Sequence, residues 1–239
     1  MKKHTYLPFV TAIFGLLGLG LRSWLFSLTD SRNLLPVWHI SSVLLGVLTA
    51  GFLIFLFLAV RPLHVIRKHS QLFPAGLPGA VGCAAAAAGV LVHCLSQFIA
   101  SRELFAMICL PAGILTAAAM GYAAVSRAKG RPVQMLPYFA LTAYLILHAF
   151  SQCQQWGSES QLLYYLQPLL ACVLLLLTAY QQTALLVQKS SRRWFVFFRM
   201  SALFFCCVSI CSQSPLFYLA MTLWTGLDQC NLQTNREGA

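Results

Sequence analysis

The chain has 239 residues, of which 59% are hydrophobic and only 9% charged, and its formal net charge is +11 at pH 7. Soluble domains carry about 25% charged residues, so this composition excludes a water-soluble globular protein and predicts an integral membrane protein. The positive charge does not indicate nucleic-acid binding, because the Lys and Arg residues lie in short segments between apolar runs.

Apolar segments that can cross the hydrocarbon core as helices, which takes about 20 residues each, follow one another along the chain. The predicted spans are 6–28, 36–60, 78–100, 104–125, 134–152, 162–187 and 194–211. A shorter apolar segment, 215–227, is either a short, tilted eighth span or a re-entrant segment. The sequence therefore predicts an all-α, polytopic bundle of seven or eight transmembrane helices that forms a single domain over residues 1–239.

Charged residues are distributed unequally between the two sides of this predicted bundle. If the spans alternate, one side holds only basic residues, namely Lys2, Lys3, Arg61, Arg67, Lys68, Arg127, Lys129, Arg131, Lys189, Arg192 and Arg193. The opposite side holds Asp30, Arg32, Arg102, Glu103 and Glu159. Because basic loops stay in the cytoplasm, we expect a multi-pass protein of the cell membrane with a cytoplasmic N-terminus. We also expect the basic loops to contact anionic lipid headgroups.

Two predicted spans end on the same pattern. The third ends with 93–97 and the fifth with 148–152, and both segments have the form H-x-x-S-Q. The seventh keeps Ser212-Gln213 and has Ser209 in place of the His. One interpretation is a bundle built from repeated helical hairpins, and the other is a chance match in an apolar chain.

Small residues predict where helices pack most closely. Gly113, Ala117 and Gly121 recur every four residues on the fourth predicted span, and small residues also dominate the third span and recur on the first. Such residues let helix backbones approach one another in a membrane. We therefore expect the first, third and fourth spans to form the tight centre of the bundle.

Acidic residues are few, and none of the five lies in the middle of a predicted span. Proton- or sodium-coupled carriers and intramembrane aspartyl proteases depend on buried carboxylates. Motifs for a zinc protease, a nucleotide-binding loop and a nucleophile elbow are also missing from the sequence. We therefore expect a protein that is not an enzyme.

Polar residues gather near the outer ends of the predicted spans. The candidate ligand-binding residues in this layer are His39, His93, Gln97, His148, Gln152, Gln213 and Arg22. In one interpretation they line a ligand pocket that is open to the outside, with Arg22 neutralising an anion. In the other they cap helix ends, and Arg22 extends to the headgroups, as we also expect of Arg199 on the cytoplasmic side.

Two special cases of this layer involve a bound metal. In one, His93 and His148 are the axial ligands of a haem, because anchor subunits hold haem between histidines on neighbouring spans. In the other, His39, His93 and His148 bind a metal with three imidazoles, as in catalytic zinc sites, but no carboxylate supports them in a second shell. We therefore predict no resident metal or cofactor, and keep haem as an alternative.

The sequence thus favours a multi-pass membrane protein that binds a small molecule, a lipid or a partner, as a transporter component. A haem- or quinone-binding membrane anchor subunit is one alternative. A structural partner subunit of a membrane complex, which would bind another membrane protein, is the other. The sequence does not identify a substrate.

Overall fold

A computed structural model of the chain describes residues 6–28, 39–61, 76–100, 104–131, 134–156, 162–187, 191–212 and 214–234. Within these segments the chain forms eight helices and no strand. They are α1 (Leu7–Ser27), α2 (Ile40–Val60), α4 (Leu77–Ala100), α5 (Leu104–Ala128), α6 (Leu136–Trp156), α7 (Leu162–Leu186), α8 (Arg192–Ser209) and α9 (Pro215–Thr234). Each predicted apolar segment corresponds to one helix, which confirms the all-α fold.

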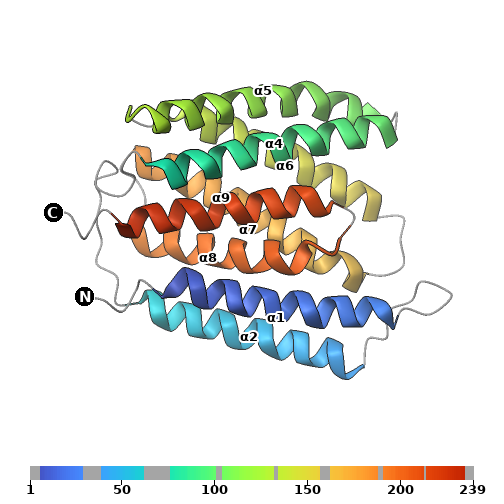
Figure 1. Ribbon diagram of the computed structural model, residues 1–239. Helices are drawn as coiled ribbons and strands as arrows, with labels where there is room; N and C mark the ends of the chain where they lie inside the picture. Colours follow the sequence, from blue (N-terminus) through green and yellow to red (C-terminus); the bar gives the residue numbers. More distant parts are fainter. Residues whose placement is uncertain are drawn as a thin grey trace.

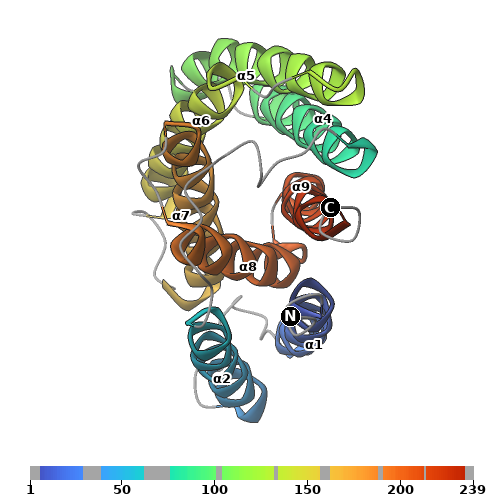
Figure 2. The ribbon, with the colours of Figure 1, turned by 90° about the vertical axis from the view of Figure 1, so that its left-hand side faces the viewer.

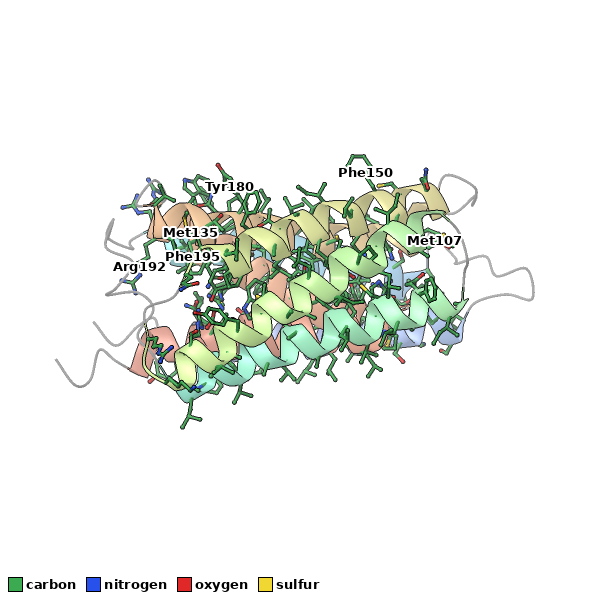
Figure 3. All side chains as sticks on the ribbon, turned by 90° about the horizontal axis from the view of Figure 1, so that it is seen from above. Met107, Met135, Phe150, Tyr180, Arg192 and Phe195 are labelled. Atoms are coloured by element: carbon green, nitrogen blue, oxygen red, sulfur yellow. The ribbon has the colours of Figure 1, made fainter. Side chains whose placement is uncertain are left out.

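The surface of the bundle is apolar, as helices in lipid require. By length and composition, α1, α2, α4, α5 and α7 can each cross a membrane. Large apolar side chains also point outward from the other helices: Phe150 on α6 is 62% exposed (Figure 3). α8 is not among the five helices that can cross a membrane by length and composition, because it carries three arginines. The bundle therefore agrees with the predicted seven or eight spans.

Six of the helices close a ring. Each of α4, α5, α6, α7, α8 and α9 packs against the next, and α9 packs back against α4 (Figure 2). The helices run along the bundle side by side (Figure 1). We call the end at which α1 begins and α9 ends the proximal end, and the other the distal end.

α1 and α2 form a hairpin on the outside of this ring and pack against α8. A run of aromatic rings joins the three helices: the Phe14 and Phe52 ring centroids are 5.6 Å apart, and those of Phe52 and Phe204 are 4.4 Å apart. A Cβ atom at Gly15 or Gly18 of α1 would overlap a side chain of α8. The hairpin is thus attached by close apolar packing.

The tight centre of the bundle differs from the expected one. Close approach does occur on α4, where a Cβ at Gly89 would overlap Ala220 of α9. On α5, a Cβ at Gly113 would likewise overlap the Cys94 side chain of α4, whereas Gly121 has open space beside it. The central helix is α8, in which every residue from Arg199 to Ser209 is buried. α8 is central because it contacts α7 and α9 in the ring and the α1–α2 hairpin outside it.

The length of α9 differs from the length of the predicted segment. The predicted segment 215–227 stops at Leu227, but the helix continues unbroken to Thr234. At 1.5 Å per residue its 20 residues extend about 30 Å, so the helix is longer than the apolar segment alone predicts. The helix continues past Leu227 because Asp228 is buried and paired inside the bundle. One of the five acids therefore does lie inside a helix of the bundle.

Candidate functional site

Two of the predicted site residues meet inside the ring. His93 of α4 and His148 of α6 are both buried, and His93 Nε2 lies 3.3 Å from His148 Nδ1. The two rings stand nearly perpendicular, and the ring of Phe217 on α9 packs against both, with centroids 5.0 and 4.9 Å away. The two H-x-x-S-Q segments therefore bring their histidines to the same level, toward the distal end.

This histidine pair has one unused nitrogen. When His93 Nε2 and His148 Nδ1 share a proton, His148 Nε2 is left over, and it is buried with no hydrogen-bond partner among the described residues. A buried polar atom without a partner costs about 1–3 kcal/mol. The pair thus has one position at which a further hydrogen-bonding group would be stabilising.

The glutamines of the predicted layer follow the histidines by one helical turn. Gln152, four residues after His148, is buried, and Gln97, four residues after His93, is half-buried. The Ser96 hydroxyl donates to the His93 carbonyl oxygen of its own helix at 2.8 Å. Gln213 lies outside the residues that the structure describes.

His39 is separate from the histidine pair. It is the N-cap of α2, where its Nδ1 accepts a hydrogen bond from the Ser41 N–H at 3.3 Å. Its ring also stands edge-on to Trp24 of α1, with centroids 5.8 Å apart. The structure therefore supports the capping interpretation for this residue.

Arg22 is buried on α1 and does not extend to a headgroup. Its Nη1 donates to the Val208 carbonyl oxygen of α8 at 3.4 Å, and its guanidinium lies 5.1 Å from the Phe26 ring centroid. Arg22 thus helps to join the hairpin to the ring, and the expectation that it extends to the headgroups is wrong.

A haem does not fit between His93 and His148 in this arrangement. Metal–imidazole bonds of about 2 Å on each side separate two axial nitrogens by about 4 Å, whereas His93 Nε2 lies 3.3 Å from His148 Nδ1, within hydrogen-bond distance. Phe217 also occupies the space against both rings. In the described part of the chain no group of three or more His, Cys, Asp or Glu side chains could hold a metal ion.

A second polar cluster, absent from the sequence-based predictions, lies toward the proximal end of the ring. Asp228 of α9 forms ion pairs with Arg127 of α5 and, at 2.6 Å, with Arg199 of α8. All three side chains are almost completely buried. Arg127 also donates to the Tyr138 hydroxyl on α6, and Gln182 Nε2 on α7 donates to Asp228 Oδ2 at 3.4 Å. We call these five residues the Arg–Asp cluster.

Arg199 is held from several directions. Its Nε donates to the Thr225 carbonyl oxygen at 3.0 Å, and its Nη2 donates to that of Trp224 at 3.3 Å. Its guanidinium also lies over two aromatic rings, 5.2 Å from the Phe195 centroid and 5.9 Å from that of Trp224. Phe195 is buried near the proximal end (Figure 3). These contacts fix the guanidinium inside the ring, so the expectation that Arg199 extends to the cytoplasmic surface is wrong.

The Arg–Asp cluster also changes the role of Arg127. Sequence patterning assigned it to a basic loop, but it lies in the last turn of α5 and its side chain is buried. The sequence could have revealed the cluster through the depth of its charged residues in the predicted bundle. Arg127, Arg199 and Asp228 all fall near the same ends of three predicted spans, with opposite charges. Buried charges at one level in a membrane bundle are expected to pair.

The two clusters are well separated. Positions 217 and 228 of α9, one in each, are about 16 Å apart along the helix at 1.5 Å per residue. Cys83, a buried residue of α4, has its Sγ 3.9 Å from the Tyr138 hydroxyl and belongs to the proximal level. The ring therefore has two distinct polar levels.

Comparison with known proteins adds no functional information. No family model, no curated protein and no solved structure matches this chain. Function must therefore be argued from the geometry of the two clusters.

Proposed function

We propose that this membrane protein binds a small polar molecule inside the distal half of the six-helix ring, as a binding component of a transport system. The observation that carries the proposal is the unpartnered Nε2 of His148, buried beside His93. Gln152, buried one turn further along α6, supplies a second hydrogen-bonding group on the same side of the helix. Phe217 and Tyr144, whose rings pack against His148, supply apolar surface.

A binding role is better supported than catalysis. Asp228 is the only carboxylate among the described residues, and two arginines hold it. A carboxylate stabilised in its charged form by two guanidinium groups is a poor general acid or base. Among the described residues, no Ser, Thr or Cys side chain forms a hydrogen bond with the imidazole of His93 or His148. A ligand is therefore expected to leave the site chemically unchanged.

Native mass spectrometry of the gently purified protein tests this proposal. The wild type is expected to carry a small-molecule adduct that the double variant His93→Ala/His148→Ala lacks. Saturation at a hundredfold excess over Kd adds about 2.7 kcal/mol of stability, so thermal unfolding should show the same loss. His39→Ala, which removes only a helix cap, is the control and should keep the adduct. An adduct unchanged in the double variant would contradict the proposal.

We further propose that the proximal end faces the cytoplasm. Arg127 is buried and does not add to the surface charge of this end. The proximal end still carries the exposed basic residues Arg61, Lys129, Arg131 and Arg193. Basic residues near span ends are retained on the cytoplasmic side. They would also attract anionic headgroups by about 1 kcal/mol each.

A further inference from the structure

We propose that the ligand of the histidine site is a small uncharged molecule with several hydroxyl groups, such as a polyol or a sugar. This inference rests on the binding role proposed above and names the chemical class of the molecule that is bound. Two observations carry it. Unpartnered polar atoms of three helices lie near the level of the histidine pair, and the charged side chains of the described residues do not contact the pair.

Gln167 of α7 lies at the level of the histidine pair. Cys172 Sγ of α7 lies 3.8 Å from the Leu145 carbonyl oxygen of α6, and the short connection between the two helices makes them run in opposite directions. At 1.5 Å per residue, Gln167 lies about 7.5 Å from this contact toward the distal end. On α6, His148 lies about 4.5 Å and Gln152 about 10.5 Å from it in the same direction. The Gln167 Oε1 atom is buried and has no hydrogen-bond partner among the described residues.

Ser209 of α8 adds a third unpartnered group near this level. Cys207 Sγ lies 4.0 Å from the Thr222 hydroxyl of α9, and the short turn between α8 and α9 makes these helices antiparallel as well. Toward the distal end, Ser209 is about 3 Å and Phe217 about 7.5 Å from this contact, so they are less than one helical turn apart in level. The Ser209 hydroxyl is buried without a partner in the described part of the chain, whereas the Thr222 hydroxyl donates to its own helix.

These atoms favour a ligand group that can both donate and accept. His148 Nε2 carries a proton when His93 donates to Nδ1, and lacks one when His148 itself donates. The Gln167 amide oxygen accepts, and the Ser209 hydroxyl does either. A hydroxyl group pairs with all three, whereas a carbonyl oxygen cannot pair with the amide oxygen. Because the three atoms come from α6, α7 and α8, a ligand needs several hydroxyl groups to reach them.

The distal level supplies no charge to a ligand. Among the described residues, neither histidine of the pair forms a hydrogen bond or an ion pair with a charged side chain. Arg22 reaches the distal half, but it belongs to α1 outside the ring and donates to the Val208 carbonyl oxygen of α8. A buried charge without a counter-charge costs several kcal/mol. The site therefore favours an uncharged ligand.

Three six-carbon probes that differ in the group at one end test the charge of the ligand. Sorbitol is neutral, gluconate carries a carboxylate, and glucamine carries an ammonium group. Each is added at millimolar concentration and equal ionic strength to extensively dialysed protein in detergent, and thermal unfolding is measured. General osmolyte stabilisation acts on every protein surface and is common to the three probes. Sorbitol is expected to raise the unfolding temperature more than either charged probe does.

Two serines of α8 provide a matched pair of variants. Ser209→Ala removes a hydroxyl near the histidine level, and should weaken the sorbitol response by about two- to tenfold in concentration. Ser201→Ala removes an equally buried and unpartnered hydroxyl about 12 Å away along the same helix, and should respond as the wild type does. Gln167→Leu should act as Ser209→Ala does. A sorbitol response that neither Ser209→Ala nor Gln167→Leu weakens would overturn the proposal.

The native adduct separates this inference from the binding role itself. After release by denaturation, its exact mass and its exchange of hydrogens in deuterated water give its charge and its number of hydroxyl groups. A neutral compound with several hydroxyl groups supports the proposal. A charged adduct, or one without hydroxyl groups, that His93→Ala/His148→Ala lacks would overturn the ligand class and leave the binding role intact.

Two further results would overturn the ligand class. The first is a larger stabilisation by gluconate or glucamine than by sorbitol. The second is the absence of both an adduct and a sorbitol response, because water alone would then satisfy the unpartnered atoms.

Discussion

At the scale of single residues, the buried charged side chains of this bundle pair with groups on other helices. Asp228 is stable in the ring because two arginines and an amide surround it. Tyr138 extends the same network, since its hydroxyl accepts from Arg127 Nη2. Leaving a buried donor of this kind without its acceptor costs about 1–3 kcal/mol, because its desolvation is no longer offset.

The first residue-scale prediction therefore concerns Tyr138. Tyr138→Phe is expected to destabilise the protein by about 1–3 kcal/mol, measured by thermal unfolding in detergent. Tyr122→Phe is the matched control: its hydroxyl is exposed and accepts only a 3.4 Å bond from Gln134. A surface change of this kind should stay within about 0.5 kcal/mol. Equal effects of the two substitutions would show that the Arg127–Tyr138 hydrogen bond contributes nothing to stability.

At the scale of helices, close backbone approach decides which elements belong together. Gly89 of α4 lies against Ala220 of α9, and Gly82 lies against the backbone of Trp224. This contact between α4 and α9 closes the ring, because the two helices are at opposite ends of the six-helix order along the chain. It also places the α9 residues Phe217 and Asp228 inside the ring, one at each polar level.

A substitution at this contact should weaken the ring. Gly89→Ala places a Cβ where it overlaps Ala220 of α9, and overpacking of this kind costs about 1–3 kcal/mol. Gly51→Ala on α2 meets nothing within 4 Å, so the higher helix propensity of Ala should leave stability unchanged or raise it by up to about 1 kcal/mol. Unfolding temperatures of the two variants provide the comparison. A Gly89→Ala protein as stable as the wild type would mean that α4 and α9 are not in close contact.

At the scale of the whole molecule, the six-helix ring and the α1–α2 hairpin differ in what they enclose and expose. The ring encloses both polar levels, while α1 and α2 pack on its outside and present large apolar side chains to the surroundings. The exposed basic residues gather at the proximal end. This asymmetry among the described residues supports the proposed orientation, with the proximal end in the cytoplasm.

Reporter fusions test that direction. A green fluorescent protein fused after Gly130, at the proximal end, should be fluorescent, because this reporter folds in the cytoplasm. An alkaline phosphatase fused after Leu28, at the distal end, should be active, because this reporter requires export. The inverse pattern at both positions would place the N-terminus outside and contradict the positive-inside assignment.

The sequence alone determined the helices, because an apolar run of about 20 residues has few alternatives in a bilayer that satisfy its backbone. It also placed His93 and His148 at one level, through a pattern that is local in each helix. Only the tertiary structure decided which side chains meet, since Arg127 and Asp228 are 101 positions apart and their pairing depends on the order of helices around the ring. The same pairing extended α9 beyond Leu227, because a charge that ends an apolar segment in isolation is stabilised once two arginines face it.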